Sequence, residues 1–244
     1  LDVDVEVRPP ASQGDVYEAA RTQPHSIALI DGYFDRVAAV WHKEILWAMS
    51  RGIHVFGASS MGALRAAELA QFGMIGVGEV FRAFRTGELT RDDEVALLHA
   101  PAEFSHRPLT VALVDVRATL DAARSTGILS PEVARALLGS ATSLHYTERT
   151  WPRILEATAD VDATWLHDFA AWLPAGRVNQ KHLDAVGLCR FVRHWLDSAP
   201  EPLLPKFTFE LTDAFRQAML RAERRDSQSP LDEVLAEASL LGEY

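Results

Sequence analysis

Two short apolar runs, each followed by a helical pattern, constrain the fold of this chain more than any other sequence feature. Residues 27–30 are fully apolar and residues 53–56 are mostly apolar. Asp35 is placed to cap a helix over residues 36–51, and residues 61–72 form a second helical pattern. Strands that alternate with helices in this way are typical of βαβ units and a parallel sheet. The first half of the chain is therefore predicted to be α/β.

Three further segments belong to this half. Residues 3–7 alternate valine with acidic residues and predict a short strand, and residues 15–21 predict a helix. Residues 94–99 predict a third parallel strand, with a helix as the competing interpretation because Ala and Leu suit either structure. The chain enters residues 3–7 almost directly from Leu1, so we expect that a first strand precedes it.

From residue 109 onward the pattern changes to helical segments separated by Pro and Gly. The expected helices cover residues 109–125, 131–142, 151–158, 180–197, 209–225 and 230–241. The links between the segments are short, so we expect this half to pack directly on the first. The prediction is an α/β fold with a parallel-sheet βαβ N-terminal half, residues 1–108, and an all-helical C-terminal half, residues 109–244, packed against it.

Charge and cysteine content exclude several classes of protein. The chain has 24 Lys and Arg against 34 Asp and Glu, a formal charge of -10, so it offers no broad cationic surface to nucleic acid. Its apolar runs are too short to span a membrane. The single cysteine, Cys189, cannot form an intrachain disulfide or a thiolate zinc site, and its apolar neighbours predict a packed thiol. We expect a cytoplasmic protein without a metal or a cofactor.

The segment with the most chemical character is the small-residue turn at residues 57–63, between a predicted strand and a predicted helix. Such a turn exposes one side chain above the sheet edge and directs helix amides toward it. In one interpretation it is a nucleophile elbow in which Ala58 replaces the first Gly of G-x-S-x-G, and Ser60 stands at its apex. The amides of Met61 and Gly62 would then face an oxyanion.

Two other interpretations of the turn stay open. Gly57, Ser59 and Gly62 form a relative of the dinucleotide-binding G-x-G-x-x-G pattern that lacks the middle glycine. In the third interpretation the turn is ordinary architecture, and Ser60 only caps the helix that follows.

Neighbouring segments favour the nucleophile. All strands of a parallel sheet end at one edge, where α/β proteins bind ligands. Asp31 follows the strand at residues 27–30, and His99 ends the predicted third strand. Ser60, His99 and Asp31 could therefore meet as nucleophile, base and orienting carboxylate. His42, in the predicted helix 36–51, competes with His99 for the role of base.

Other charged residues have a structural explanation beside a functional one. Lys43 could act on a substrate, but a helix Lys followed by Glu usually forms a solvated pair. Arg65 could bind a substrate carboxylate or pair locally with Glu68. The acidic run at residues 92–94 could hold Mg²⁺, but such runs are usually solvated.

Four segments carry a family resemblance: residues 31–34, 41–46, 57–69 and 92–99. Together with Arg8-Pro9-Pro10 and residues 14–17, they resemble the sequence blocks of TfuA-like proteins. The resemblance covers about residues 7 to 120 and leaves most of the helical half unmatched. Relative to the family, we expect the first strand and its Gly-Pro-Ser loop to be missing from these residues.

The resemblance implies a role beside a YcaO-type ATP-dependent enzyme that installs thioamides in peptides or in a protein backbone. The YcaO partner activates the amide, and the TfuA-like protein helps to supply sulfide. If the donor is the C-terminal thiocarboxylate of a ubiquitin-like sulfur carrier, Ser60 could attack the acyl carbon and release sulfide. Lys43, Arg65 and Ser59, with Met61 and Gly62, would then bind the donor.

Two other classes of function compete with the hydrolase. The chain could be a non-catalytic adaptor or allosteric activator of the YcaO enzyme, with the helical half as its docking surface. It could also be a nucleotide-binding module, which would bind ATP or NAD by itself.

Overall fold

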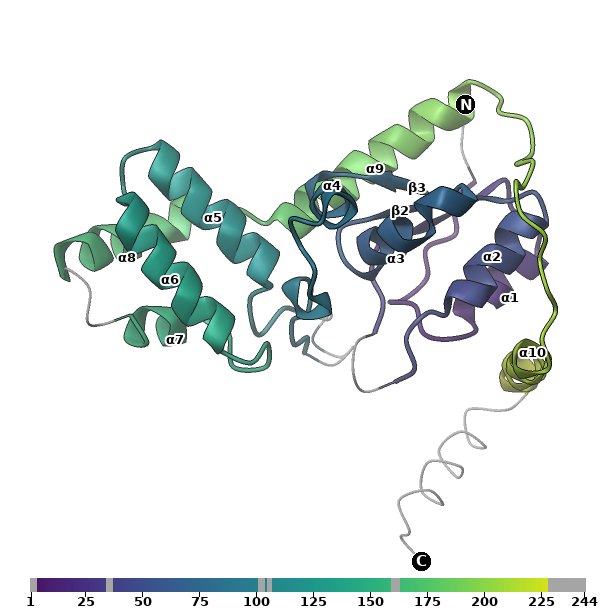
Figure 1. The fold of residues 1–244 in the computed structure, drawn as a ribbon, viewed down its shortest axis with the longest axis horizontal. Helices are drawn as coiled ribbons and strands as arrows, with labels where there is room; N and C mark the ends of the chain where they lie inside the picture. Colours follow the sequence, from purple (N-terminus) through teal and green to yellow (C-terminus); the bar gives the residue numbers. More distant parts are fainter. Residues whose placement is uncertain (1–3, 34–36, 101–103, 105–106, 159–162, 228–244) are drawn as a thin grey trace, which may run out of the picture.

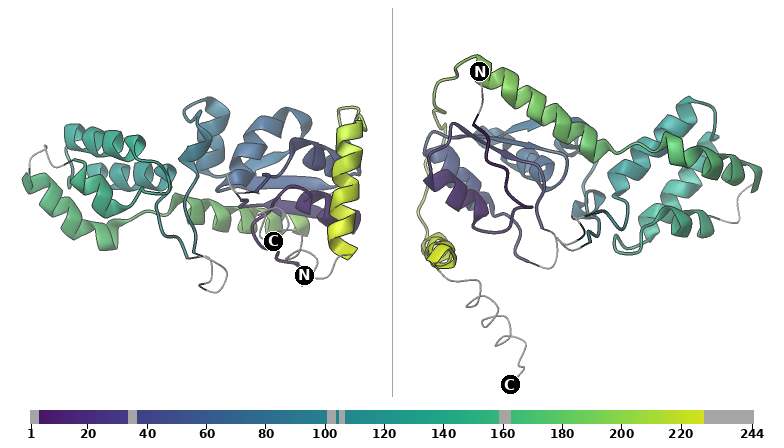
Figure 2. Two further views of the ribbon diagram at one scale, coloured as in Figure 1. Left: turned by 90° about the horizontal axis from the view of Figure 1, so that it is seen from below. Right: turned by 180° about the vertical axis from the view of Figure 1, so that it is seen from behind.

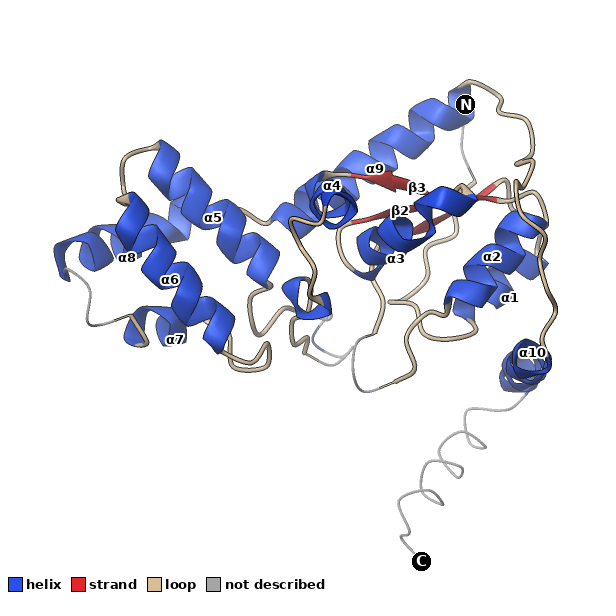
Figure 3. Cartoon of the chain, in the orientation of Figure 1, coloured by secondary structure: helices blue, strands red, loops and turns tan. Residues whose placement is uncertain are grey.

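A three-stranded parallel sheet forms the centre of the first half of the chain. The computed structural model describes residues 4–33, 37–100, 104, 107–158 and 163–227. The strands are β1 (Ser26–Leu29), β2 (His54–Ala58) and β3 (Ile75–Val77), in the order β1-β2-β3 (Figure 1). The strands are short, and most of the structure around them is helical (Figure 3). The α/β class predicted from the sequence is confirmed.

Helices cover both faces of this sheet. The helices of the first half are α1 (Asp15–Arg21), α2 (His42–Ser50), α3 (Met61–Leu69) and α4 (Glu79–Thr86). On one face, Val55 of β2 shares a core with apolar residues of α1, α2 and α3. On the other face, Phe56 and Ala58 of the same strand pack against Leu188 of α9 (Gln180–Asp197). Alternate residues of β2 thus point to opposite cores, as a strand covered on both faces requires.

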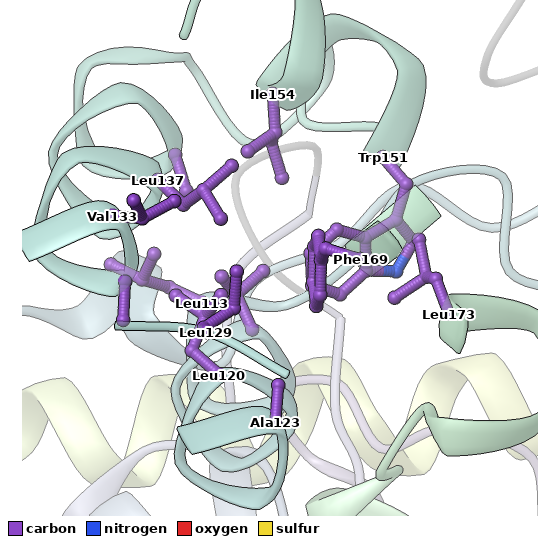
Figure 4. Packing of buried hydrophobic residues seen from close by; sticks show 13 residues of the cluster. Leu113, Leu120, Ala123, Leu129, Val133, Leu137, Trp151, Ile154, Phe169 and Leu173 are labelled. Carbon is purple, nitrogen blue, oxygen red and sulfur yellow. The ribbon is translucent and has the colours of Figure 1, made fainter. Parts of the chain in front are cut away.

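The second half forms a helical lobe and then returns to the sheet. The lobe contains α5 (Leu113–Ser125), α6 (Pro131–Ser143), α7 (Trp151–Glu156) and α8 (Ala163–Gly176). Its core includes Leu113, Leu137, Ile154 and Phe169, all fully buried (Figure 4). Helix α9 runs from this lobe along the sheet (Figures 1 and 2). The expected packing of the helical half on the α/β half is made chiefly by α9.

The last described helix, α10 (Asp213–Ser227), packs on the α1 and α2 side of the first half. Its Phe215 is buried beside Tyr17 and Trp41. The Tyr17 hydroxyl donates a hydrogen bond of 2.8 Å to Glu223. The buried Glu44 carboxylate supports the same side, because it accepts the amides of α1 and the amide of Trp41.

Most predicted helices and two predicted strands are confirmed. The predicted helix at residues 15–21 is α1, and the strands at residues 27–30 and 53–56 correspond to β1 and β2 within two residues. The helix at residues 61–72 is α3 followed by the 3-10 turn η1 (Ala70–Phe72). The predicted helix at residues 230–241 lies outside the described residues, and the division at residue 108 stays a prediction.

The predicted third strand is wrong. Residues 92–94 form the 3-10 turn η2 (Asp92–Glu94), and residues 95–98 have no regular structure. His99 lies in none of the three strands, and its backbone forms an isolated β-bridge with Pro108. The third strand is β3, which the sequence conceals because it is three residues long and contains Gly76.

Three smaller expectations are also wrong, and one helix was missed. Among the described residues, 4–7 form no strand. Helix α2 begins at His42 rather than residue 36, while the proposed cap Asp35 lies outside the described residues. Helix α8 was not predicted. Cys189 is exposed on α9 rather than packed.

Within the described part of the chain, no helix has the length and hydrophobicity needed to cross a membrane.

Candidate active site

A cleft of about 710 Å³ lies between the carboxyl edge of the sheet and the helical lobe. One wall comes from the ends of β1 and β2 and from the loop after η2. The other wall comes from α5, α7 and the junction of α8 with α9. The residues that line the cleft and carry a polar or aromatic side chain are Asp31, Ser59, His99, Thr110, Asp115, Thr119, Thr150, Trp151, Arg177, Asn179, Lys181 and His182.

Ser59 lies at the sharpest point of the β2–α3 turn. Its φ of 72° is in the left-handed region, which costs a residue with a side chain about 1–3 kcal/mol and is concentrated at functional sites. Ser59 is 3% exposed, yet it lines the cleft, and its hydroxyl bonds to no described residue. The positive φ of this turn falls on Ser59, whereas the sequence predicted an elbow with Ser60 at its apex.

Two glycines let the turn approach its neighbours. A Cβ on Gly62 would overlap the carbonyl of Leu29, and one on Gly57 would overlap the carbonyl of Gly62. Helix α3 therefore begins in direct backbone contact with the end of β1. The residue types that suggested a nucleotide-binding turn are explained by this packing.

The predicted oxyanion site is only partly available. The amide of Gly62 donates to the carbonyl of Ile30 at 3.3 Å, so it is not directed into the cleft. The amide of Ser60 donates to the same carbonyl at 3.2 Å. The Met61 amide has no acceptor among the described residues. The expectation that Met61 and Gly62 act together stays a prediction, in which Gly62 would have to release the Ile30 carbonyl. Engagement of two of the three amides also disfavours a phosphate at this turn.

Asp31 and His99 lie close together in the cleft. The sequence predicted that they would meet, but it placed His99 at the end of a strand that does not form. The Asp31 Oδ2 lies 3.8 Å from the His99 Nε2, and both side chains are about one-third exposed. The other Asp31 oxygen accepts the amide of Gly32 at 2.9 Å, which fixes the carboxylate. The loop after η2 therefore delivers His99 to the sheet edge, although it is not a strand.

His42 and Arg65 belong to a different cluster. The His42 Nε2 lies 2.7 Å from Glu68, and Arg65 donates to the same carboxylate at 2.8 Å. Burial raises the pKa of Glu68, but hydrogen bonds and charge from His42 and Arg65 outweigh it, so the pKa is lowered. Neither His42 nor Arg65 lines the cleft. The local pairing of Arg65 with Glu68 is the interpretation that the structure supports.

The Lys43 side chain also makes its contacts outside the cleft. Its ammonium donates to the Glu210 carbonyl at 2.6 Å and lies 4.7 Å from the centre of the Phe209 ring. Lys43 therefore holds the segment that leads into α10 and does not line the cleft.

The acidic run at residues 92–94 binds arginines. The buried Glu94 carboxylate accepts two hydrogen bonds from Arg117, at 3.0 and 2.8 Å. Asp93 accepts from Arg91 and from the fully buried Arg149. Within the described residues, no group of three potential metal ligands is found. Through these ion pairs the run joins the loop after η2 to the helical lobe.

The second wall of the cleft was missed from the sequence. The buried Asp115 of α5 accepts the Lys181 amide at 3.0 Å, and Thr119 accepts the Val178 amide at 3.0 Å. Burial raises the pKa of Asp115, while the amide and charge of Lys181 oppose the shift. The 8%-exposed Lys181 also donates to the Val95 carbonyl at 3.0 Å. These contacts depend on α5 packing against α9, which no local sequence signal reports.

Comparison with known proteins agrees with the resemblance. Comparison with curated proteins gave no match. The sequence model of the TfuA-like protein family matches residues 31–150, which contain β2, β3, the Ser59 turn and His99. That family is known as a group of YcaO-associated accessory proteins. Residues 31–150 of the chain therefore form a TfuA-like domain.

Proposed function

We propose that this chain serves a YcaO-type enzyme in thioamide formation as a serine hydrolase that releases sulfide from a thiocarboxylated, ubiquitin-like sulfur carrier. The observation that supports it best is the cleft in which Ser59, His99 and Asp31 lie together. The family supplies the link to a YcaO partner. The carrier and the reaction come from the chemistry that such a site can perform.

The proposed reaction has two steps. In the first, the Ser59 Oγ bonds to the acyl carbon of the thiocarboxylate, its proton passes through His99 to sulfur, and sulfide leaves as HS⁻. In the second, water attacks the acyl-serine with His99 as base and restores the serine and a carboxylate. The sum is hydrolysis of a thiocarboxylate to a carboxylate and sulfide, without an oxidant or a reductant. Asp31 stabilises the protonated imidazole of His99.

Ser59 is preferred to Ser60 as the nucleophile for a geometric reason. Ser59 lines the cleft and has a positive φ, whereas Ser60 does not line it. No hydrogen bond joins Ser59 to His99 in the described structure, but catalytic hydrogen bonds often form only when substrate is bound. Of the two candidate bases, His99 is preferred because it lines the cleft and His42 does not.

The test is sulfide release from a thiocarboxylated carrier protein, without a YcaO enzyme, by wild type, Ser59→Ala and Ser60→Ala. We expect Ser59→Ala to lose at least about a hundredfold in rate, as removal of a catalytic nucleophile does. Ser60→Ala is the matched control, one residue away and equally buried, and should keep most of the rate. Undiminished release by Ser59→Ala would overturn the proposed nucleophile.

An adaptor role is the second candidate, and the surface of α9 favours it. Leu183 and Phe191 are 55% and 42% exposed there, and large exposed apolar side chains on one helix suit a protein partner. The adaptor role predicts that Ser59→Ala still activates the YcaO enzyme fully, whereas Leu183→Ser and Phe191→Ser do not. Failure of wild type to release sulfide, with activation retained, would favour the adaptor.

A further inference from the structure

The junction of α8 and α9 carries the positive charge of the cleft. Arg177 and His182 are exposed, line the cleft, and have no acidic partner among the described residues. The two acidic residues of the cleft are already engaged: Asp31 faces His99, and Asp115 accepts the Lys181 amide. The wall opposite Ser59 therefore holds the Arg177 guanidinium without an acidic partner, in a chain whose net charge is -10.

The buried Lys181 strengthens this charge. Its ammonium has three donors, and one of them is used by the Val95 carbonyl. Because burial removes water, a buried ammonium acts on nearby charges more strongly than an exposed one. The Lys181 amide donates a hydrogen bond to Asp115 and the Val178 amide donates one to Thr119, and these two bonds fix the position of the junction. Arg177 is thus an exposed donor on a backbone that these hydrogen bonds hold in place.

We propose that Arg177, supported by Lys181, is the specificity-determining residue of the cleft and selects an acyl chain that ends in an anionic carboxylate or thiocarboxylate. This inference rests on the proposed function and names its substrate class. It moves the role of anion binding from Lys43 and Arg65, which are engaged outside the cleft, to residues beyond the family match at residues 31–150. A neutral amide or ester end would leave the Arg177 guanidinium without its partner.

Binding without turnover tests the inference. The probe is a fluorescently labelled eight-residue Gly-Ser peptide with a free C-terminal carboxylate, compared by anisotropy with the same peptide ending in an amide. Wild type should bind the carboxylate form about tenfold more tightly, since hydrogen bonds to charged groups contribute about that factor. Arg177→Gln should lose this preference, and Arg193→Gln, an exposed arginine of α9 outside the cleft, should keep it.

The outcomes separate this inference from the proposed reaction. Equal binding of both peptides by wild type, or an unchanged preference in Arg177→Gln, would overturn the selection of an anion. The proposed hydrolysis could still hold in that case, because it is read from Ser59→Ala. Conversely, a carboxylate preference that depends on Arg177 would stand even if Ser59→Ala kept its rate of sulfide release.

Discussion

The two walls of the cleft are built by different means. The wall with Ser59 and Asp31 lies at the ends of β1 and β2, where backbone contacts fix it, including those of Gly62 with Leu29 and Ile30. The wall with Arg177 and Lys181 lies where two helices meet, and it is fixed by backbone amides that donate hydrogen bonds to the side chains of Asp115 and Thr119. The first wall lies mostly within the family match, and the α8–α9 junction lies beyond it.

This difference teaches which features of the site should change together. A parallel sheet places the ends of its strands at one edge whatever side chains follow, so the chemical groups of the first wall come with the topology. The second wall depends on how α5 packs on α9, so a change of side chains there can alter what the cleft binds. We expect the first wall to determine the reaction and the second to determine the substrate.

The largest expected effect breaks the first wall. Gly62→Ala should lower the free energy of unfolding by about 3 kcal/mol or more, because the added Cβ overlaps backbone that cannot move aside. Urea unfolding followed by circular dichroism measures it. The control is Gly139→Ala in α6, where a Cβ meets nothing within 4 Å and should stabilise the helix by up to about 1 kcal/mol. Equal stabilities of the two variants would contradict the close contact.

The next effect breaks the second wall. Asp115→Ala leaves the buried Lys181 amide without its acceptor and should cost about 2 kcal/mol. Asp115→Asn keeps an acceptor and should recover most of this loss. Because the pKa of Asp115 is raised by burial, its ionised form is disfavoured in the folded protein. The stability that wild type has below the unfolded pKa should therefore fall as pH rises through the folded pKa, and the Asn variant should lack this decrease.

A smaller effect separates stability from activity at the turn. Ser59→Gly should raise the free energy of unfolding by about 1 kcal/mol, because glycine adopts a φ of 72° without strain, and it should abolish sulfide release. Ser60 has a φ of -119°, outside the left-handed region, so Ser60→Gly should not gain stability in this way. Thermal unfolding and sulfide release of the two variants provide the comparison. A Ser59→Gly protein that is less stable than Ser60→Gly would contradict the strained turn.

The smallest effect concerns the cluster outside the cleft. Glu68→Gln should cost about 0.5 kcal/mol at pH 7, as exposed ion pairs do, and leave sulfide release unchanged. Since His42 and Arg65 lower the pKa of Glu68, its contribution is present above the unfolded pKa. It is lost as pH falls through the folded pKa, so the stabilities of variant and wild type should converge in acid. A large loss of sulfide release would instead place this cluster in the active site.

The sequence predicted the parts of the site that follow from local pattern. Apolar runs identified β1 and β2, and their ends brought Asp31 and the Ser59–Ser60 pair to one edge. The positive φ falls on Ser59 and not on Ser60, which the sequence could not indicate because the sign of φ cannot be read from two adjacent serines. The apolar residues within 94–99 resemble a strand in the sequence, and Val95 and Ala96 are indeed buried. However, Glu94 accepts a hydrogen bond from Arg117 and the Val95 carbonyl accepts one from Lys181, and these contacts hold the loop apart from the sheet. Arg177 had no signal because its position depends on α5, more than fifty residues earlier in the chain.

The central claim is that Ser59 is the reactive serine, and covalent labelling tests it most directly. Wild-type protein would be treated with a fluorophosphonate, digested with trypsin and analysed by tandem mass spectrometry, since cleavage after Arg51 and Arg65 leaves both serines on one peptide. The account predicts an adduct on Ser59, reduced by prior addition of the carrier and absent from Ser59→Ala. An adduct on Ser60, or sulfide release by a protein with no labelled serine in this peptide, would contradict it.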